Sequence, residues 1–222
     1  MKVVIIGGVA GGASAAARLR RLDERAEIIM LERGEYISYA NCGLPYYIGG
    51  EITEKRQLTL QTPERFGQRF NVDVRVQSEA VAIDAQNKTV KVRTKDGTYA
   101  ESYDKLILSP GAEPILPPIE GIRDERIFTL RTIPDAYRIE EFIKANRAKT
   151  AVIVGGGFIG VEMAENLMRL GVAVTIVEVT NHILGTLDYD SACEVQSYLR
   201  YKNVRLLLNR AVEAFNAKDE SL

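Results

Sequence analysis

The sequence is short of the features that mark several large classes of protein. Charge is nearly balanced, with 29 Lys and Arg against 30 Asp and Glu in 222 residues, so no basic excess points to nucleic acid. No apolar run approaches the ~20 residues that a membrane-spanning helix requires. Residues 1–12 run from a short apolar stretch into glycines, which favours a first β-strand over a signal peptide. We therefore expect a soluble, cytoplasmic protein that binds neither nucleic acid nor membrane.

Residues that form disulfides or bind metals are also scarce. Two cysteines, Cys42 and Cys193, cannot build a disulfide scaffold, and a single histidine, His182, leaves little material for a zinc site. A Ser-His-Asp triad would have to use His182, whose neighbours are typical of an ordinary loop. We expect no metal site.

The chain does contain one pattern twice. A short β-branched run leads into a glycine-rich turn at residues 7–12, then into a helical stretch and a second apolar run that ends in Glu32. The same order recurs around residues 155–160 and ends in Glu178, and the two turns start 148 positions apart. Each acid follows its last glycine by about 20 residues, as the dinucleotide-binding fingerprint requires.

The pattern has a chemical reason. Glycines let the backbone approach a pyrophosphate, the helix start offers N–H groups and a positive dipole end, and the acid accepts hydrogen bonds from a ribose diol. One glycine turn can arise from packing alone, but two complete copies argue against that interpretation. In the first copy Val9 replaces the middle glycine, so the second copy is the cleaner match. The fingerprint residues that we expect to bind dinucleotides are Gly7, Gly8, Val9, Ala10, Gly11, Gly12 and Glu32, and Gly155, Gly157, Phe158, Ile159, Gly160 and Glu178.

The fold class predicted from this pattern is α/β. We expect a Rossmann-like, three-layer first domain with a β-meander over residues 1–118, a connector over 119–149, and the first part of a second Rossmann-like domain over 150–222. The predicted meander strands are residues 72–76, 79–84 and 89–92, with a further strand at 103–108. Helices are predicted from Thr62 onward, at 133–146 and at 188–201, and a last strand at 204–208.

The two cysteines receive different interpretations. A lone cysteine is most often a small buried hydrophobe, and Cys193, within an amphipathic helical stretch, keeps that interpretation. Cys42 follows a nucleotide-binding strand and opens a predicted helix, whose N-terminal dipole lowers the pKa of a thiol. We therefore expect Cys42 to be the reactive one.

Four segments together resemble the pyridine nucleotide-disulfide oxidoreductases. These are GGVAGGASAAARLRRL, SYANCGLPYYIGG, YDKLILSPGA and VIVGGGFIGVEMAENL, which span nearly the whole chain. The chain is most similar to the group of coenzyme A-disulfide reductases and NAD(P)H persulfide or polysulfide reductases, which also includes NADH oxidases and peroxidases. The SxxNCxLPY block is specific to the single-cysteine branch. Where two-cysteine branches carry a partner thiol five positions later, this chain has Tyr47.

The resemblance implies FAD on the first copy, NADH on the second, with NADPH a further candidate, and a coenzyme A-type disulfide or persulfide as the substrate. Hydride passes from the nicotinamide to the flavin, and two electrons then reach the sulfur bonded to Cys42. Family positions that contact flavin or nicotinamide match Arg33, Ser109, Gly111, Ala112, Phe158 and Glu162. Family positions that contact coenzyme A match Ser14, Arg18, Arg21, Ser38 and Asn41, although Phe70 replaces a common Lys.

Several alternatives stay open at this point. Cys42 could instead be oxidised to a sulfenic acid, as in NADH oxidases and peroxidases, and Arg18 and Arg21 could form a solvated basic helix face. Family segments beyond residue 222 include a second flavin motif and a dimerisation domain. We thus expect a piece of a longer, homodimeric protein, and an inactive nucleotide-binding fragment is a third reading. Glu178, with no Arg among residues 179–181, predicts a preference for NADH over NADPH.

Overall fold

The computed structural model describes residues 1–216, which fall into two compact units. Unit one comprises residues 1–40 and 56–112, and unit two comprises residues 41–55 and those from 113 onward. The predicted nucleotide-binding domains, residues 1–118 and 150–222, are defined by the ligand that each would bind rather than by compactness, and they stay a prediction. The strands are β1 (Lys2–Ile6), β2 (Glu27–Leu31), β3 (Asp73–Arg75), β4 (Glu79–Asp84), β5 (Thr89–Thr94), β6 (Gly97–Ser102), β7 (Lys105–Leu108), β8 (Thr150–Val154), β9 (Ala173–Val177) and β10 (Arg205–Leu207). The helices are α1 (Ala10–Leu22), α2 (Leu44–Ile48), α3 (Pro63–Phe70), α4 (Ile133–Asn146), α5 (Phe158–Arg169) and α6 (Tyr189–Tyr201).

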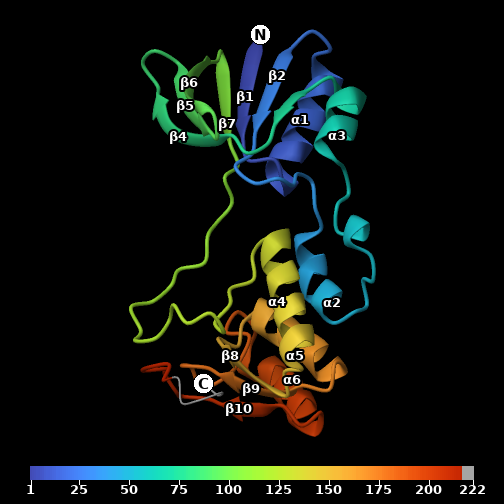
Figure 1. Cartoon of the computed structure of the whole chain (residues 1–222), viewed down its shortest axis with the longest axis vertical. Coiled ribbons are helices and arrows are strands. Elements are labelled where there is room, and N and C mark those ends of the chain that lie inside the picture. Colours follow the sequence, from blue (N-terminus) through green and yellow to red (C-terminus); the bar gives the residue numbers. More distant parts are fainter. Residues whose placement is uncertain (217–222) are drawn as a thin grey trace. The chain divides into compact units, whose positions relative to one another are not determined.

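Unit one has three layers around a parallel sheet of order β3-β2-β1-β7. Alternate side chains of its strands face opposite sides, so each side buries its own cluster. Ile5 and Met30 pack under α1 and α3, with Phe66 supplied by α3. On the other side Val4 packs beneath Val92 of the meander. Figure 1 shows the helices and the meander on opposite sides of β1 and β2. The predicted three-layer, Rossmann-like arrangement is confirmed.

The meander differs from the prediction in which strands form it. The sequence placed residues 72–76 in it, whereas β3 lies in the parallel sheet and pairs with β2. The antiparallel meander is β4-β5-β6, so residues 97–102, which were not predicted as a strand, supply its third member. The error has a simple cause, because alternating hydrophobicity marks a strand but does not identify its partner.

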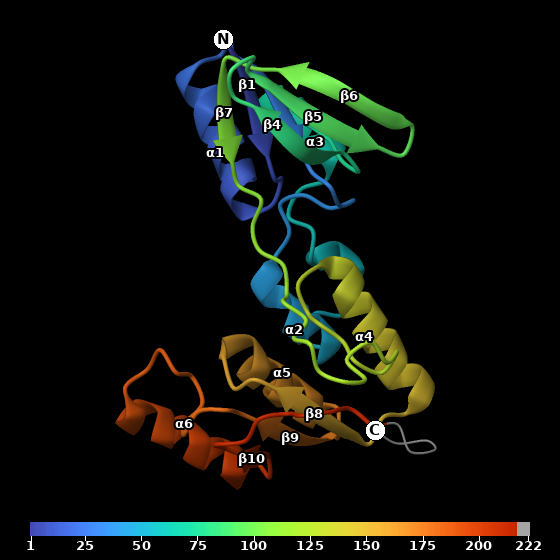
Figure 2. The same ribbon diagram turned by 90° about the vertical axis from the view of Figure 1, so that its left-hand side faces the viewer.

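Unit two repeats the first half of this plan with a parallel sheet of order β10-β9-β8. Helix α5 packs on β8 and β9, as Figure 2 shows, and α2 lies against both α4 and α5. Val174 and Ile176 are buried, whereas Val152 and Val154 on the edge strand are 65% and 54% exposed. The predicted strands and helices of this half are all present. Thr132 caps the N-terminus of α4 and forms a capping box with Asp135.

Among residues 1–216, no helix combines the length and apolar character that crossing a membrane requires. Nor do three or more His, Cys, Asp or Glu side chains of that range gather as ligands for a metal ion.

Candidate functional site

Both glycine turns leave their strand in the same way. Gly7 and Gly155 have φ values of 96° and 102°, a region that glycine occupies without strain. Each donates its N–H to the neighbouring strand, Gly7 to the Leu31 carbonyl at 2.8 Å and Gly155 to the Val177 carbonyl at 2.9 Å. The duplicated sequence pattern is therefore a duplicated backbone geometry.

The helices that follow the turns start without side-chain caps. Neither α1 nor α5 has a capping side chain or an acidic residue in its first turn. By contrast, α3 and α4 are capped by Thr62 and Thr132 and carry acids in the first turn, Glu64 and Asp135. Uncapped N–H groups at the positive end of a helix dipole suit an anionic ligand. The residues present thus fit the pyrophosphate of a dinucleotide at both turns.

The two acids are held by equivalent hydrogen bonds. One carboxylate oxygen of Glu32 accepts from Gly8 N at 2.8 Å and the other from Gly34 N at 2.8 Å. Glu178 accepts in the same way from Gly156 N at 2.7 Å and from Thr180 N at 2.9 Å. Each acid is thereby fixed beside the second glycine of its own turn.

The ionisation of Glu178 follows from these contacts. Burial raises the pKa of its carboxyl, but the N–H donors of Gly156 and Thr180 and the Thr180 hydroxyl outweigh burial, so the net pKa lies below its ordinary value. The hydroxyl of Thr180 lies 2.8 Å from the carboxylate and 2.7 Å from the His182 carbonyl. It can turn to that carbonyl and leave a carboxylate lone pair to a ligand hydroxyl.

A returning loop closes each turn, which the sequence did not reveal. Ser38 donates its N–H to the Gly8 carbonyl at 2.9 Å, and Leu184 donates to the Gly156 carbonyl at 2.8 Å. Both donors have positive φ, 44° and 53°. The residues before these two donors, Ile37 and Ile183, pack against Gly8 and Gly156. A Cβ added to either glycine would lie within 2.7 Å of its isoleucine. Aligning the two acids would have matched these loops in the sequence.

The Ser109–Ala112 turn, expected at the first site, does lie there. Ser109 donates its N–H to the Ile6 carbonyl at 2.8 Å. A Cβ added to Gly11 would lie 2.2 Å from the Ser109 hydroxyl, so a side chain at position 11 would force that hydroxyl to turn away. Gly111 has a φ of 71°, and Ala112 is exposed. Arg33, next to Glu32, is exposed as well.

The candidate nucleophile lies in unit two. Cys42 is exposed in a 3-10 turn (η1, Asn41–Gly43), whereas Cys193 is half-buried. The expected position at a helix start is corrected in part, because α2 begins at Leu44 and has only five residues. Tyr47, five positions on, is buried, and its hydroxyl donates to Glu140 at 3.0 Å. Burial and this carboxylate raise the pKa of Tyr47 to about 12.

The predicted substrate residues divide between the units. Ser14, Arg18 and Arg21 are exposed and spaced four and three apart on α1, so they share one helix face. Arg20 instead donates to backbone carbonyls of α3 and the residue after it. Ser38 belongs to unit one and Asn41 to unit two.

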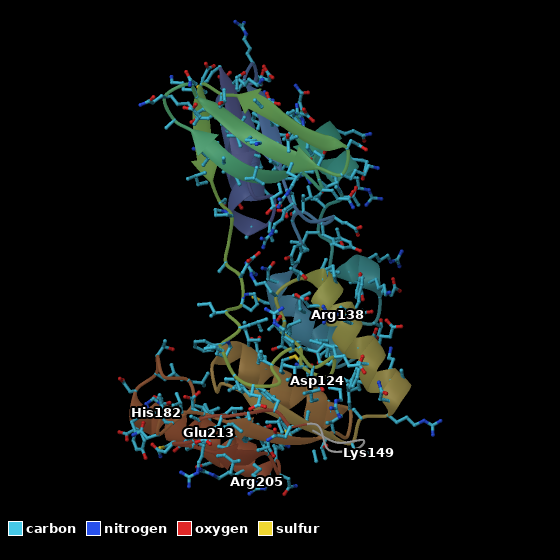
Figure 3. All side chains as sticks on the ribbon, turned by 60° about the vertical axis from the view of Figure 1, so that its left-hand side comes forward. Asp124, Arg138, Lys149, His182, Arg205 and Glu213 are labelled. Atoms are coloured by element: carbon cyan, nitrogen blue, oxygen red, sulfur yellow. The ribbon has the colours of Figure 1, made fainter. Side chains whose placement is uncertain are left out.

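At the second turn, Phe158 and Ile159 are 58% and 55% exposed. Helix α5, which carries Glu162, packs on α2, which carries Tyr46. Burial first, and then the charge of Glu162, raise the pKa of Tyr46. The sequence missed one neighbour of this site. Arg210 donates its backbone N–H to the Glu178 carbonyl at 3.0 Å, just beyond β10, the strand on which Figure 3 labels Arg205. Only sheet pairing brings it there.

Comparison with known proteins matches the whole chain to one family model, described as pyridine nucleotide-disulphide oxidoreductase, over residues 1–222. A coenzyme A disulfide reductase from Staphylococcus aureus strain Newman is 36% identical over 220 residues, covering 98% of this chain and 50% of that protein. The chain thus spans about half the length of this curated relative.

Two solved structures are also similar. Reduced CoADR-RHD from Bacillus anthracis is 53% identical with a TM-score of 0.93, covering 96% of this chain and 39% of that chain. An NAD-dependent persulfide reductase from A. fulgidus is 38% identical with a TM-score of 0.94, covering 99% of this chain and 42% of that chain.

Proposed function

Because the chain belongs to the pyridine nucleotide-disulphide oxidoreductase family, we propose that its full-length protein is an FAD-dependent NAD(P)H oxidoreductase. It reduces coenzyme A disulfide, or coenzyme A persulfide or polysulfide, through the single redox-active residue Cys42. The observation that carries the proposal is the repeated turn, in which an uncapped helix and a backbone-held acid recur at two sites of one chain.

FAD is assigned to the first site. The bare N–H groups at the start of α1 would hold its pyrophosphate, and Glu32 would accept from its ribose. The turn that packs on Gly11 through Ser109 would lie against the same phosphates. Arg33, Gly111 and Ala112 complete this candidate set. When bound, FAD supplies two-electron transfer between a nicotinamide and a sulfur.

The nicotinamide dinucleotide is assigned to the second site. Its pyrophosphate would meet the uncapped start of α5, and Glu178 would accept from its ribose hydroxyls. The lowered pKa keeps Glu178 ionised at neutral pH, so a 2′-phosphate would meet a like charge. NADH is therefore the preferred cofactor. Phe158 and Glu162 would border the nicotinamide end.

Cys42 performs the sulfur chemistry. Its exposed thiolate attacks one sulfur of the substrate disulfide, an S–S bond forms to Cys42, and the other half leaves as a thiolate. The mixed disulfide then needs two electrons to release the second thiol and regenerate the cysteine. Tyr47, five positions after Cys42, is a buried phenol bonded to Glu140, so the residue at that position cannot resolve the mixed disulfide.

The substrate's phosphates are assigned to the exposed face of α1. Arg18 and Arg21 are exposed, one turn apart, and their guanidinium groups can bind phosphate oxygens in pairs. Ser14, Ser38 and Asn41 complete the candidate set. We place the full-length protein, as a homodimer, in the cytoplasm.

The test compares Cys42→Ser with Cys193→Ser in the full-length protein. We expect the first variant to retain FAD and lose NADH-dependent reduction of coenzyme A disulfide, because a hydroxyl forms no mixed disulfide. The second variant should behave as the parent. Reduction by Cys42→Ser at the parental rate would remove Cys42 from the reaction. If the unmutated full-length protein oxidised NADH with oxygen but reduced neither coenzyme A disulfide nor coenzyme A persulfide, it would be an oxidase and not a reductase.

A further inference from the structure

The short helix that follows Cys42 is held in place by its neighbours. Helix α2 has five residues and no capping side chain, and a helix of that length is not stable in water on its own. It packs against α4 and α5, and the turn that contains Cys42 leads directly into it (Figure 1). The position of Cys42 therefore depends on the contacts that fix α2.

Two of these contacts involve polar side chains. On the α4 side, the ring of Tyr47 packs on Tyr137 with centroids 5.4 Å apart, and its hydroxyl donates to Glu140 at 3.0 Å. On the α5 side, Arg169 pairs with Glu51, just beyond the end of α2. Both side chains of that ion pair are more than half exposed, so it contributes little. The α5 side must be fixed by another contact.

That contact is made by Gly49 and Asn166. A Cβ added to Gly49 would lie 2.2 Å from the Oδ1 of Asn166 and 2.8 Å from its Cβ, so a side chain at position 49 would push the two helices apart. The φ of Gly49 is −72°, which any residue adopts. The glycine is therefore explained by this close approach, and the pair sets how near α2 lies to α5.

The side chain of Asn166 is locked in one orientation. It is fully buried, and its Nδ2 donates to the Glu162 carbonyl one turn back at 2.8 Å, which directs Oδ1 to Gly49. No donor within residues 1–216 reaches Oδ1, although buried polar atoms are as a rule hydrogen-bonded. An apolar side chain would avoid that cost but would lack the bond that locks the amide. The amide thus indicates a place where the position of α2 matters more than stability.

We propose that Asn166 is a positioning residue for Cys42, whose contact with Gly49 sets the place of α2 and hence of the thiol. Asn166 acts through α2 and not by touching the substrate. Attack on a disulfide needs the thiolate in a defined geometry, and a displacement of about 1 Å can slow such a step by about a hundredfold. This inference rests on the proposed function, because it needs Cys42 as the nucleophile.

The experiment measures how fast coenzyme A disulfide forms an adduct on Cys42 of the full-length protein without NADH. Gly49→Ala should slow this step about tenfold or more, because its methyl group needs the space of the Asn166 Oδ1 and Cβ. Asn166→Gly alone should slow it as well. Since Asn166→Gly removes both of those atoms, adding it to Gly49→Ala should restore most of the rate. The matched control is Leu167→Ala, which removes a buried side chain from another face of α5 and should leave the rate unchanged.

A second readout separates positioning from general damage. Reduction of ferricyanide by NADH needs no thiol, so its rate should be the same in all these variants. If the unmutated protein forms the adduct and Gly49→Ala forms it equally fast, the positioning role is wrong and the proposed function stands. A parallel loss of ferricyanide reduction, equal slowing by Leu167→Ala, or no recovery in the double variant would also refute that role. If the unmutated protein forms no adduct on Cys42, the proposed function is wrong and the positioning role falls with it.

Discussion

Glu178→Gln should change the choice between NADH and NADPH. A carboxylate about 4 Å from a 2′-phosphate, at an effective dielectric constant of about 20, is repelled by about 4 kcal/mol. Glu178 is half-buried, so water and salt screen part of this and leave about 1.5–2.5 kcal/mol, or about tenfold to seventyfold in affinity. The parent should therefore bind NADH at least about tenfold more tightly than NADPH. The neutral amide should bring the two affinities close together, chiefly by improving NADPH.

Equilibrium titration of both cofactors, followed by fluorescence, measures this ratio. The matched control is Glu32→Gln, which gives up one of the two equivalent bonds, from Gly8 or Gly34, at the other turn and should leave the ratio unchanged. The parental ratio should also shrink as ionic strength rises, because the repulsion is electrostatic. Equal affinities in the parent, or an unchanged ratio in Glu178→Gln, would refute the reasoning.

Three other outcomes are expected. Glu101→Gln should lower the free energy of unfolding by about 2 kcal/mol, because this buried carboxylate bonds Lys2 and Arg75. Burial raises the pKa of Glu101, but the two cations lower it by more, so the folded-state pKa lies below its ordinary value. The stabilisation should therefore be present above the unfolded-state pKa and be lost as the pH falls through the folded-state pKa. Calorimetry at several pH values checks both, and a pH-independent difference would contradict them. Thr132→Ala should lower the free energy of unfolding by about 1 kcal/mol, because α4 loses its cap, and should leave the affinity for NADH unchanged. A variant that loses NADH affinity but melts like the unmutated protein would contradict this. The 222-residue chain should bind FAD weakly and self-associate through exposed apolar residues such as Val152, and a tight flavin complex eluting as a compact monomer would show otherwise.

The repeated unit was predictable because its features depend on residues close together in the sequence. The sequence shows β-branched strands, glycines that need special backbone geometry and an acid at fixed spacing. Both copies fold as expected. Val9, which breaks the fingerprint, leaves the start of α1 uncapped, as the start of α5 is.

Features that depend on partners distant in the sequence were missed. Residues 97–102 joined the meander because β5 offered a partner, not because of a strong pattern of their own. Arg210 reaches Glu178 only through the pairing of β10 with β9. Tyr189 meets His182 only because α6 starts beside the loop. Cys42 was predicted to be reactive from its neighbours in sequence, and that role stays a prediction. Its place before α2 rather than in it depends on where that helix begins.

In the proposed mechanism, Cys42 exchanges with the sulfur of a coenzyme A disulfide. The most direct test incubates the full-length protein with coenzyme A disulfide in the absence of NADH, so that no electrons reach the mixed disulfide. Peptide mass analysis should then find one coenzyme A attached to the peptide that contains Cys42, released by a reducing agent. Adduct on Cys193 alone, or no adduct while the protein still turns over with NADH, would contradict the mechanism.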